Sequence, residues 1–278
     1  MVTIRVAHSP DADDAFMHYA AVHGLVETRG LRFEEVLADI ETLNQAACNG
    51  TYEVTAISIH AYAYVAERYA LLSSGASMGD GYGPVVIARE PLTREALAGR
   101  PVATPGRWTS ARLAFQLWQP QAQCVDVPFD GVAATVASGA AVAGVLIHEG
   151  QLTYGHEGFH LVVDLGAWWK EQTGLPLPLG GNAVRRDLPR ELMRSIAIVL
   201  TDSVAWALRH REEALTHALH FARGLSAEQA DRFVGMYVNH WTLDYGREGR
   251  EAVQRFLGAG AAAGLVPSVP ELTLVYPW

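Results

Sequence analysis

The sequence predicts an α/β fold of two lobes with mixed, mostly parallel sheets and a cleft between the lobes. Three observations lead to this prediction. Strand and helix patterns alternate from the first residues onward, a segment rich in Pro and Gly follows at residues 175–181, and helices dominate from Leu188 to the end. In addition, residues 144–147 form an unbroken apolar run, which is typical of a strand that helices cover on both faces.

The composition indicates a large core and a small-molecule partner. Half of the 278 residues are hydrophobic, 18% are charged, and the formal net charge is -9 without a cluster of Lys or Arg. These features argue against nucleic acid or an anionic membrane as the partner. The first residues look like a strand, with neither a basic n-region nor a long apolar h-region, so we expect a cytoplasmic protein. A monomer or homodimer is expected, without a sequence pattern that decides between them. Cys48 and Cys124 lie far apart without metal-ligand spacing, so neither a metal site nor a disulfide is predicted.

The first strand and helix are joined by an acidic loop. Residues 4–8 read as a strand, and apolar residues at helical spacing follow the loop. We interpret Asp11 and Asp13 as ordinary capping residues in the first helical turn, where the helix dipole favours negative charge. Ser9 and Asp14 are expected to hold substrate hydroxyls, because polar groups at a helix start are natural ligand partners.

The second unit repeats the strand and helix order. Residues 31–37 alternate as a strand, and Asp39 is expected to cap the helix that carries Asn44. The third strand, at residues 54–58, ends in the hydroxyl of Ser58, and a helix begins immediately afterwards. This rhythm predicts right-handed crossovers and places a small polar group at a strand end.

A glycine-rich segment at residues 79–84 leads into the next lobe. It precedes a strand and lacks Lys-Ser/Thr, so we interpret it as a turn or hinge and not as a phosphate-binding loop. A short helix is expected at residues 92–100. Further on, Thr109 and Ser110 stand at the start of an apolar helix, where hydroxyls and free N–H groups receive a carboxylate or several hydroxyls. Thr and Ser are also common caps, so this pattern alone is weak.

The apolar run at residues 144–147 ends at His148. Ligands of open α/β sheets bind beyond the carboxyl ends of the strands, and imidazole accepts protons near neutral pH. A lone histidine at this position can also be a buried residue that forms a hydrogen bond with the backbone. The polar residues Ser58, Thr109 and Ser110, which are expected around the same cleft, favour instead the interpretation of His148 as a catalytic base. Glu149 is expected to point to the opposite face and not to orient the imidazole.

The lobes are expected to divide the chain at two boundaries. Residues 1–89 and 176–278 would form the larger lobe with the C-terminal helices, and residues 90–175 the smaller inserted lobe. This organisation resembles the type-2 periplasmic-binding-protein fold, which closes on a small ligand between its lobes. Fold alone does not decide between a carrier and a catalyst.

Five segments, in order along the chain, resemble one enzyme family. They are HSPDADDAF at residues 8–16, DIETLN at 39–44, PGRWTSA at 105–111, GVLIHE at 144–149 and DLGAWW at 164–169. Together they are similar to the 1,4-dihydroxy-6-naphthoate synthases, which cleave cyclic dehypoxanthine futalosine in the futalosine route to menaquinone.

The resemblance implies a carbon–carbon lyase without a cofactor. It implies that His148 accepts the substrate's proton. The substrate contacts that the resemblance carries over are Ala56, Ile57, Ser58, Thr109 and Ser110, and to these we add Ser9, Asp14 and Asn44. Family members can carry Asn where Asp13 stands and other residues at positions 59 and 60, so no catalytic role is assigned there.

Two alternatives remain open at this point. The first is a solute-binding protein that only captures a small anion, as many proteins of this fold do. The second is another enzyme of the same pathway, such as a chorismate dehydratase. A redox or metal enzyme is disfavoured, because the sequence contains no dinucleotide fingerprint and no ligand cluster.

Overall fold

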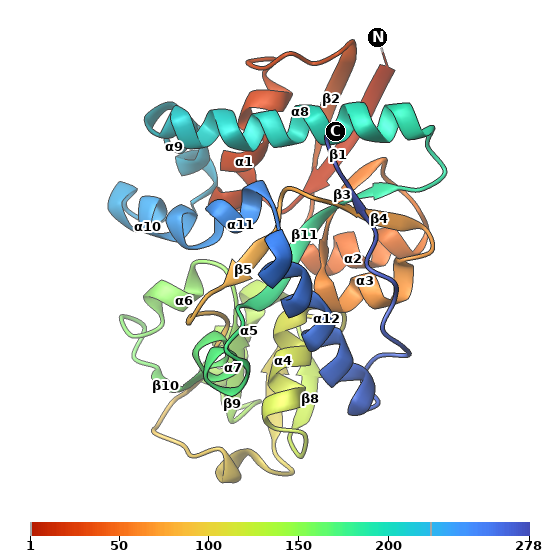
Figure 1. Ribbon diagram of the computed structural model, residues 1–278. Helices are drawn as coiled ribbons and strands as arrows, with labels where there is room; N and C mark the ends of the chain where they lie inside the picture. The colour runs from red at the N-terminus through yellow and green to blue at the C-terminus, as the bar shows by residue number, and fades with distance from the viewer. Residues whose placement is uncertain (1, 223) are drawn as a thin grey trace.

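The computed structural model describes residues 2–222 and 224–278, which form two β-sheets with helices around them (Figure 1). The seven-stranded sheet contains β1 (Val2–His8), β2 (Leu31–Leu37), β3 (Val54–Ser58), β4 (Tyr69–Leu72), β5 (Ser77–Gly79), β11 (Leu177–Arg185) and β12 (Leu274–Val275). The five-stranded sheet contains β6 (Val85–Ala88), β7 (Pro101–Thr104), β8 (Gln123–Asp126), β9 (Ala143–Leu146) and β10 (His160–Asp164).

Helices cover both sheets and fill most of the C-terminal third. They are α1 (Ala12–Val22), α2 (Ile40–Cys48), α3 (Ile59–Val65), α4 (Ser110–Trp118), α5 (Val132–Ala137), α6 (Gly150–Thr153), α7 (Leu165–Thr173), α8 (Arg190–Arg209), α9 (Arg211–Ala218), α10 (Ala227–Tyr237), α11 (His240–Leu243) and α12 (Gly246–Ala262). In Figure 1, α8 lies across the seven-stranded sheet, and α12 descends beside β11 toward α4.

Local sequence signals account for several helix boundaries. The Asp39 carboxylate accepts a hydrogen bond from the backbone N–H of Thr42 and so caps α2. Ser226 and Gln229 form a reciprocal capping box at the start of α10. Gly264, with φ of 70°, follows the end of α12 in the left-handed conformation that glycine adopts without strain.

The chain passes between the two sheets twice within the described residues. It leaves the first sheet after β5 and returns through α7 into β11. The two passages are neighbours, because β5 and β11 pair antiparallel, with Leu177 opposite Gly79 and Gly180 opposite Ser77. The extended segment expected at residues 175–181 is therefore the beginning of a central strand and also one of the two connections between the lobes.

Two predictions of strand arrangement are wrong in detail. The sheets are mixed but not mostly parallel, because the returning strand β11 runs antiparallel to β3, β4 and β5, and β6 runs antiparallel to β9 and β10. Residues 85–88, which the boundary at residue 89 assigned to the larger lobe, pair in the five-stranded sheet. The division into residues 1–89 with 176–278 and residues 90–175 otherwise stays a prediction.

One predicted helix is also too long. The helix expected at residues 92–100 is reduced to a single 3₁₀ turn, Glu95–Leu97. Gly99 adopts φ of 69° directly afterwards, and Pro101 begins β7. A left-handed residue and a proline so close to the turn leave no room for helical continuation.

The close packing of Gly166 against the loop before β6 leads to a prediction about stability. A Cβ atom at this position would overlap the carbonyl oxygen of Tyr82 in the loop before β6. Gly166→Ala should therefore lower the free energy of unfolding by about 1–3 kcal/mol, measured by urea denaturation. Gly155→Ala is the matched control, because a Cβ there meets nothing within 4 Å. Equal stability of the two variants would contradict this packing.

Candidate active site

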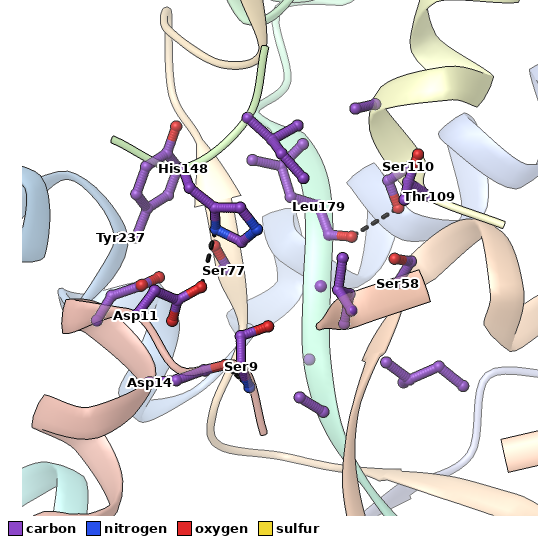
Figure 2. Close-up of a pocket in the computed structure, with 18 of the residues that line it drawn as sticks. Ser9, Asp11, Asp14, Ser58, Ser77, Thr109, Ser110, His148, Leu179 and Tyr237 are labelled. Atoms are coloured by element: carbon purple, nitrogen blue, oxygen red, sulfur yellow. Dashed lines mark hydrogen bonds and ion pairs between the residues drawn. The ribbon is translucent and has the colours of Figure 1, made fainter. Parts of the chain in front are cut away.

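A pocket of about 720 Å³, part of it open to solvent, lies between the two sheets (Figure 2). It gathers the sequence-predicted site residues with one exception, Asn44. The predicted residues that line it are Ser9, Asp14, Ala56, Ile57, Ser58, Thr109, Ser110 and His148. Asp11 and Asp13 line it as well, although the sequence patterns did not single them out as site residues.

His148 reaches the pocket from the five-stranded sheet. It follows β9 and has a φ of 55°, a left-handed conformation that is uncommon for residues other than glycine. Its Nδ1 atom lies 2.8 Å from Oδ2 of Asp11, and the exposed fractions of the two side chains are 15% and 3%. The Phe129 ring packs edge-on against the imidazole at a centroid distance of 5.0 Å. The imidazole is thus held from two sides.

The carboxylate of Asp11 contacts this imidazole and does not cap a helix. Asp11 occupies the N-cap position of α1, but its side chain makes no capping hydrogen bond. The interpretation of Asp11 as an ordinary capping residue is therefore wrong for its side chain. The reason is that the start of α1 forms one wall of the pocket, where the imidazole of His148 approaches from the other sheet.

The other two aspartates of α1 have strongly shifted pKa values. Burial, with the negative charge of Asp11 added, raises the pKa of Asp14 to about 7, although His8 and His148 oppose this shift. The Oδ2 atom of Asp14 accepts a hydrogen bond of 2.9 Å from the backbone N–H of Ser9. Burial raises the pKa of Asp13 well above its usual range, with the charges of Asp11 and Asp14 adding to it. The environment of Asp13 therefore favours its neutral, protonated form.

Two stacked imidazoles lie behind this acidic wall. The rings of His8 and His18 are 4.5 Å apart between centroids. Burial lowers the pKa of His8, but the hydrogen bond of 3.0 Å to Glu35 and the charge of Asp14 outweigh it and raise the pKa overall. Burial and the charge of His8 lower the pKa of His18 to about 3. Neutral His18 can then accept from Asn182, whose Nδ2 atom is 3.2 Å from Nε2.

The opposite wall begins at Ser58, the last residue of β3. Asn44 donates from Nδ2 to the Ser58 hydroxyl at 3.0 Å and accepts from the Ser58 backbone N–H at 2.9 Å. Asn44 is fully buried and lies outside the pocket lining. The predicted direct substrate contact of Asn44 is therefore corrected to an orienting role. Because Asn44 donates to one lone pair of the Ser58 oxygen, the hydroxyl proton of Ser58 is directed elsewhere and can be donated to a ligand.

The hydroxyls of Thr109 and Ser110 are engaged by the protein itself. Thr109 caps α4, accepting from the Arg112 backbone N–H and donating to the Gly106 carbonyl. Ser110 donates to the Leu179 carbonyl at 2.6 Å and accepts from the His60 backbone N–H at 3.1 Å. Their hydroxyl protons are thus already committed. At the start of α4, the donors that remain for a ligand are therefore the backbone N–H groups of Ser110 and Ala111, beside the Ser58 hydroxyl.

The floor between the two walls is strand β11. Figure 2 shows this strand between the side of His148 and Asp11 and the side of Ser58, Thr109 and Ser110. Gly180 and Gly181 line the pocket here, so a flat ligand can approach the backbone closely. A Cβ atom at Gly181 would overlap the Tyr245 hydroxyl on the other side of the strand. Apolar side chains complete the middle of the pocket, including Met17, Ile57 and Phe233.

Two further contacts join the lobes at the edges of the pocket. The Tyr237 hydroxyl on α10 lies 2.5 Å from the side-chain amide of Gln151 on α6. Glu41 on α2 accepts a hydrogen bond of 2.8 Å from the backbone N–H of Trp108, just before α4. Polar groups from the two sides of the pocket are therefore in direct contact at its edges.

Two absences concern the described residues alone. Within residues 2–222 and 224–278, no group of three or more His, Cys, Asp or Glu side chains is arranged to hold a metal ion. In the same part of the chain, no helix is long and apolar enough to cross a membrane.

The pKa of Asp14 predicts how one variant changes stability with pH. The folded state raises this pKa from 3.8 to about 7, so the wild-type carboxylate destabilises the fold progressively as the pH rises through this interval. Asn at this position keeps an acceptor for the Ser9 N–H. Asp14→Asn should therefore be more stable than wild type at pH 8, by on the order of 1–3 kcal/mol, and equally stable below pH 4.

Urea denaturation across pH 4 to 8 measures this difference. The matched control is Asp187→Asn, which replaces an exposed aspartate that pairs with Arg185 far from the pocket. It should change the free energy of unfolding by only a few tenths of a kcal/mol. A stability gain for Asp14→Asn that is the same at every pH would contradict the prediction.

Comparisons with known proteins identify the family. A family model described as menaquinone biosynthesis matches residues 4–262. A relative from Thermus thermophilus named 1,4-dihydroxy-6-naphthoate synthase is 45% identical, over 97% of this chain and 98% of the relative. A relative of the same name from Streptomyces coelicolor is 34% identical, over 99% of each chain.

Solved structures show the same fold. The crystal structure of protein AF1704 from Archaeoglobus fulgidus has a TM-score of 0.91 and 47% identity, covering 95% of this chain and 98% of that one. The Candida albicans CA3427 product, described as having the generic periplasmic binding protein fold, has a TM-score of 0.68 at 13% identity, over 99% and 98% of the chains. This last likeness confirms the predicted fold. The chain therefore belongs to the menaquinone-biosynthesis family that includes the 1,4-dihydroxy-6-naphthoate synthases.

Proposed function

We propose that the protein is a 1,4-dihydroxy-6-naphthoate synthase, a lyase that converts cyclic dehypoxanthine futalosine to 1,4-dihydroxy-6-naphthoate. Two relatives with this enzyme name match nearly the full chain. The structural observation that carries the proposal is the His148 imidazole, which a carboxylate holds at the edge of a pocket between two lobes. A carrier needs only to bind its ligand, whereas a held imidazole beside buried acids provides acid–base chemistry.

His148 is the proposed proton acceptor. The base removes a proton, the electron pair left behind forms a new double bond on the ring side, and the bond to the sugar-derived fragment breaks. The electron pair of that bond leaves with the fragment, which takes up a proton, and tautomerisation of the remaining ring system makes it aromatic. Aromatisation favours the products, so the protein has to supply a placed base, hydrogen-bond donors for developing negative charge, and a site without bulk water. Movement of the lobes over the bound substrate is proposed to meet the last requirement, because part of the pocket is open to solvent.

The opposite wall is proposed to supply the donors. The Ser58 hydroxyl, oriented by Asn44, and the backbone N–H groups at Ser110 and Ala111 face the pocket from two helix starts. Ser9 and Asp14 are proposed to hold hydroxyls of the sugar-derived fragment, because a carboxylate accepts from hydroxyls and repels the acid group of the naphthoate. Ala56 and Ile57 contribute the strand edge beside them.

The cellular setting is part of the same proposal. We place the enzyme in the cytoplasm, as a monomer or homodimer acting on a small molecule. The two cysteines, Cys48 and Cys124, are free thiols, which agrees with a reducing compartment.

Incubation with candidate substrates tests the activity. Cyclic dehypoxanthine futalosine should yield 1,4-dihydroxy-6-naphthoate, detected by mass spectrometry. Turnover of chorismate in its place would identify a dehydratase. Binding of the naphthoate or its precursor without any turnover would instead identify a carrier, and either result would reject the proposal.

Replacement of His148 tests the mechanism. Asn is the better substitution because it tolerates the left-handed backbone at this position, and Ala serves as a second variant. Both should lower kcat by about 10²- to 10⁴-fold, the usual contribution of a general base, while the affinity for the product stays within a few-fold. Steady-state kinetics and product titration measure the two quantities. A variant with near-normal kcat would remove His148 from the mechanism.

A further inference from the structure

We infer that Asp11 is the positioning residue of the base His148, and that closure of the two lobes completes this pair. The inference rests on the proposed function, since it assigns a partner to the proposed base. It concerns a residue whose sequence context indicates only helix capping.

The geometry of the pair is that of an oriented imidazole. The Asp11 Oδ2 atom and the His148 Nδ1 atom are 2.8 Å apart, and both side chains are largely buried. A carboxylate at this distance holds the proton on Nδ1, so the lone pair of the neutral ring is on Nε2. Figure 2 shows the opposite side of the ring directed toward the middle of the pocket. Asp11 therefore favours the tautomer with its proton on Nδ1. In this tautomer, Nε2 can accept a proton from a ligand that lies on β11.

The two partners come from different lobes. Asp11 lies between β1 and α1 beside the seven-stranded sheet, whereas His148 follows β9 of the five-stranded sheet. Only two passages of the described chain connect these sheets, which is the arrangement of a hinged pair of lobes. Rotation about those passages separates Asp11 from His148 without unfolding either lobe. The open enzyme then has an imidazole without its carboxylate, and closure on the substrate restores it.

Other charged and titratable groups surround the pair and contribute to its titration. Asp13 and Asp14 face it from α1, Glu149 from the start of α6, and Tyr237 from α10, with His8 behind Asp14. The carboxylate of Asp11 is the group that is in direct contact with the His148 ring nitrogen. The test therefore has to compare variants at Asp11 itself.

Steady-state kinetics of Asp11→Asn give the first measurement. Loss of the orienting carboxylate should lower kcat by about 10²- to 10⁴-fold, while KM stays within about threefold. The acidic limb of the kcat/KM profile should move to lower pH, because the imidazolium loses its stabilising charge. Asp231→Asn is the matched control, since it breaks an ion pair of the same length, 2.8 Å to Arg211, outside the pocket. A pure stability defect in Asp11→Asn, without the change in pH profile, would overturn the inference.

A double-mutant cycle separates positioning from an independent catalytic role. If Asp11 acts through His148, the double variant Asp11→Asn/His148→Asn should be no slower than His148→Asn alone. Rate losses that multiply would show that Asp11 acts separately, and would overturn the inference.

An NMR titration of the imidazole tests the role of closure. The His148 signal, identified by its loss in His148→Asn, should titrate at higher pH with bound 1,4-dihydroxy-6-naphthoate than in the free enzyme. This difference should shrink in Asp11→Asn, where the ligand is present but the carboxylate is absent. A difference that Asp11→Asn leaves unchanged would overturn the closure step. The titration needs no turnover, so its outcome is separate from success or failure of the proposed reaction.

Discussion

The contact between the Asp11 carboxylate and the His148 imidazole is the interaction on which the site depends. It joins two sheets that the described chain connects only twice, and it forms at the edge of the pocket. The left-handed backbone at His148 and the ring of Phe129 hold the imidazole from its own lobe. The start of α1 supplies the carboxylate from the other. The arrangement resembles other enzymes in which a domain motion assembles the catalytic groups around the substrate.

The acidic wall is tolerated because its charges are partly neutralised. Three carboxyl groups within four residues would repel one another if all were ionised. Burial raises the pKa of Asp13 well above its usual range and so favours its neutral form, while the positive end of the α1 dipole and the charge of His8 oppose the repulsion at Asp14. His8 in turn is balanced by Glu35 at 3.0 Å. Burying these carboxyl groups lowers the stability of the fold at one place only, the start of α1. This is the part of the helix that lines the pocket and presents polar groups to a ligand.

The sequence predicted the fold and much of the site because these rest on local patterns. The apolar strand before His148 and the polar ends of β3 and α4 are visible in short segments, and the pocket gathers them. Asp11 was missed because its partner is distant in the chain, and three aspartates at a helix start have a local explanation. The hydrogen bond from the Ser110 hydroxyl to the Leu179 carbonyl depends on how α4 packs against β11. A short sequence segment contains no information about this packing. The direction of β11 likewise follows from the complete path of the chain.

The pairing of β5 with β11 makes the floor of the pocket and the connection between the lobes one structure. A ligand that rests on Gly180 and Gly181 lies against the strand that carries the chain back from the five-stranded sheet. A side chain at Gly181 would overlap the Tyr245 hydroxyl, so a larger residue there would disturb the strand that is both the floor and the connection. Changes of ligand preference are therefore better accommodated on the two walls, where substitutions leave this strand intact.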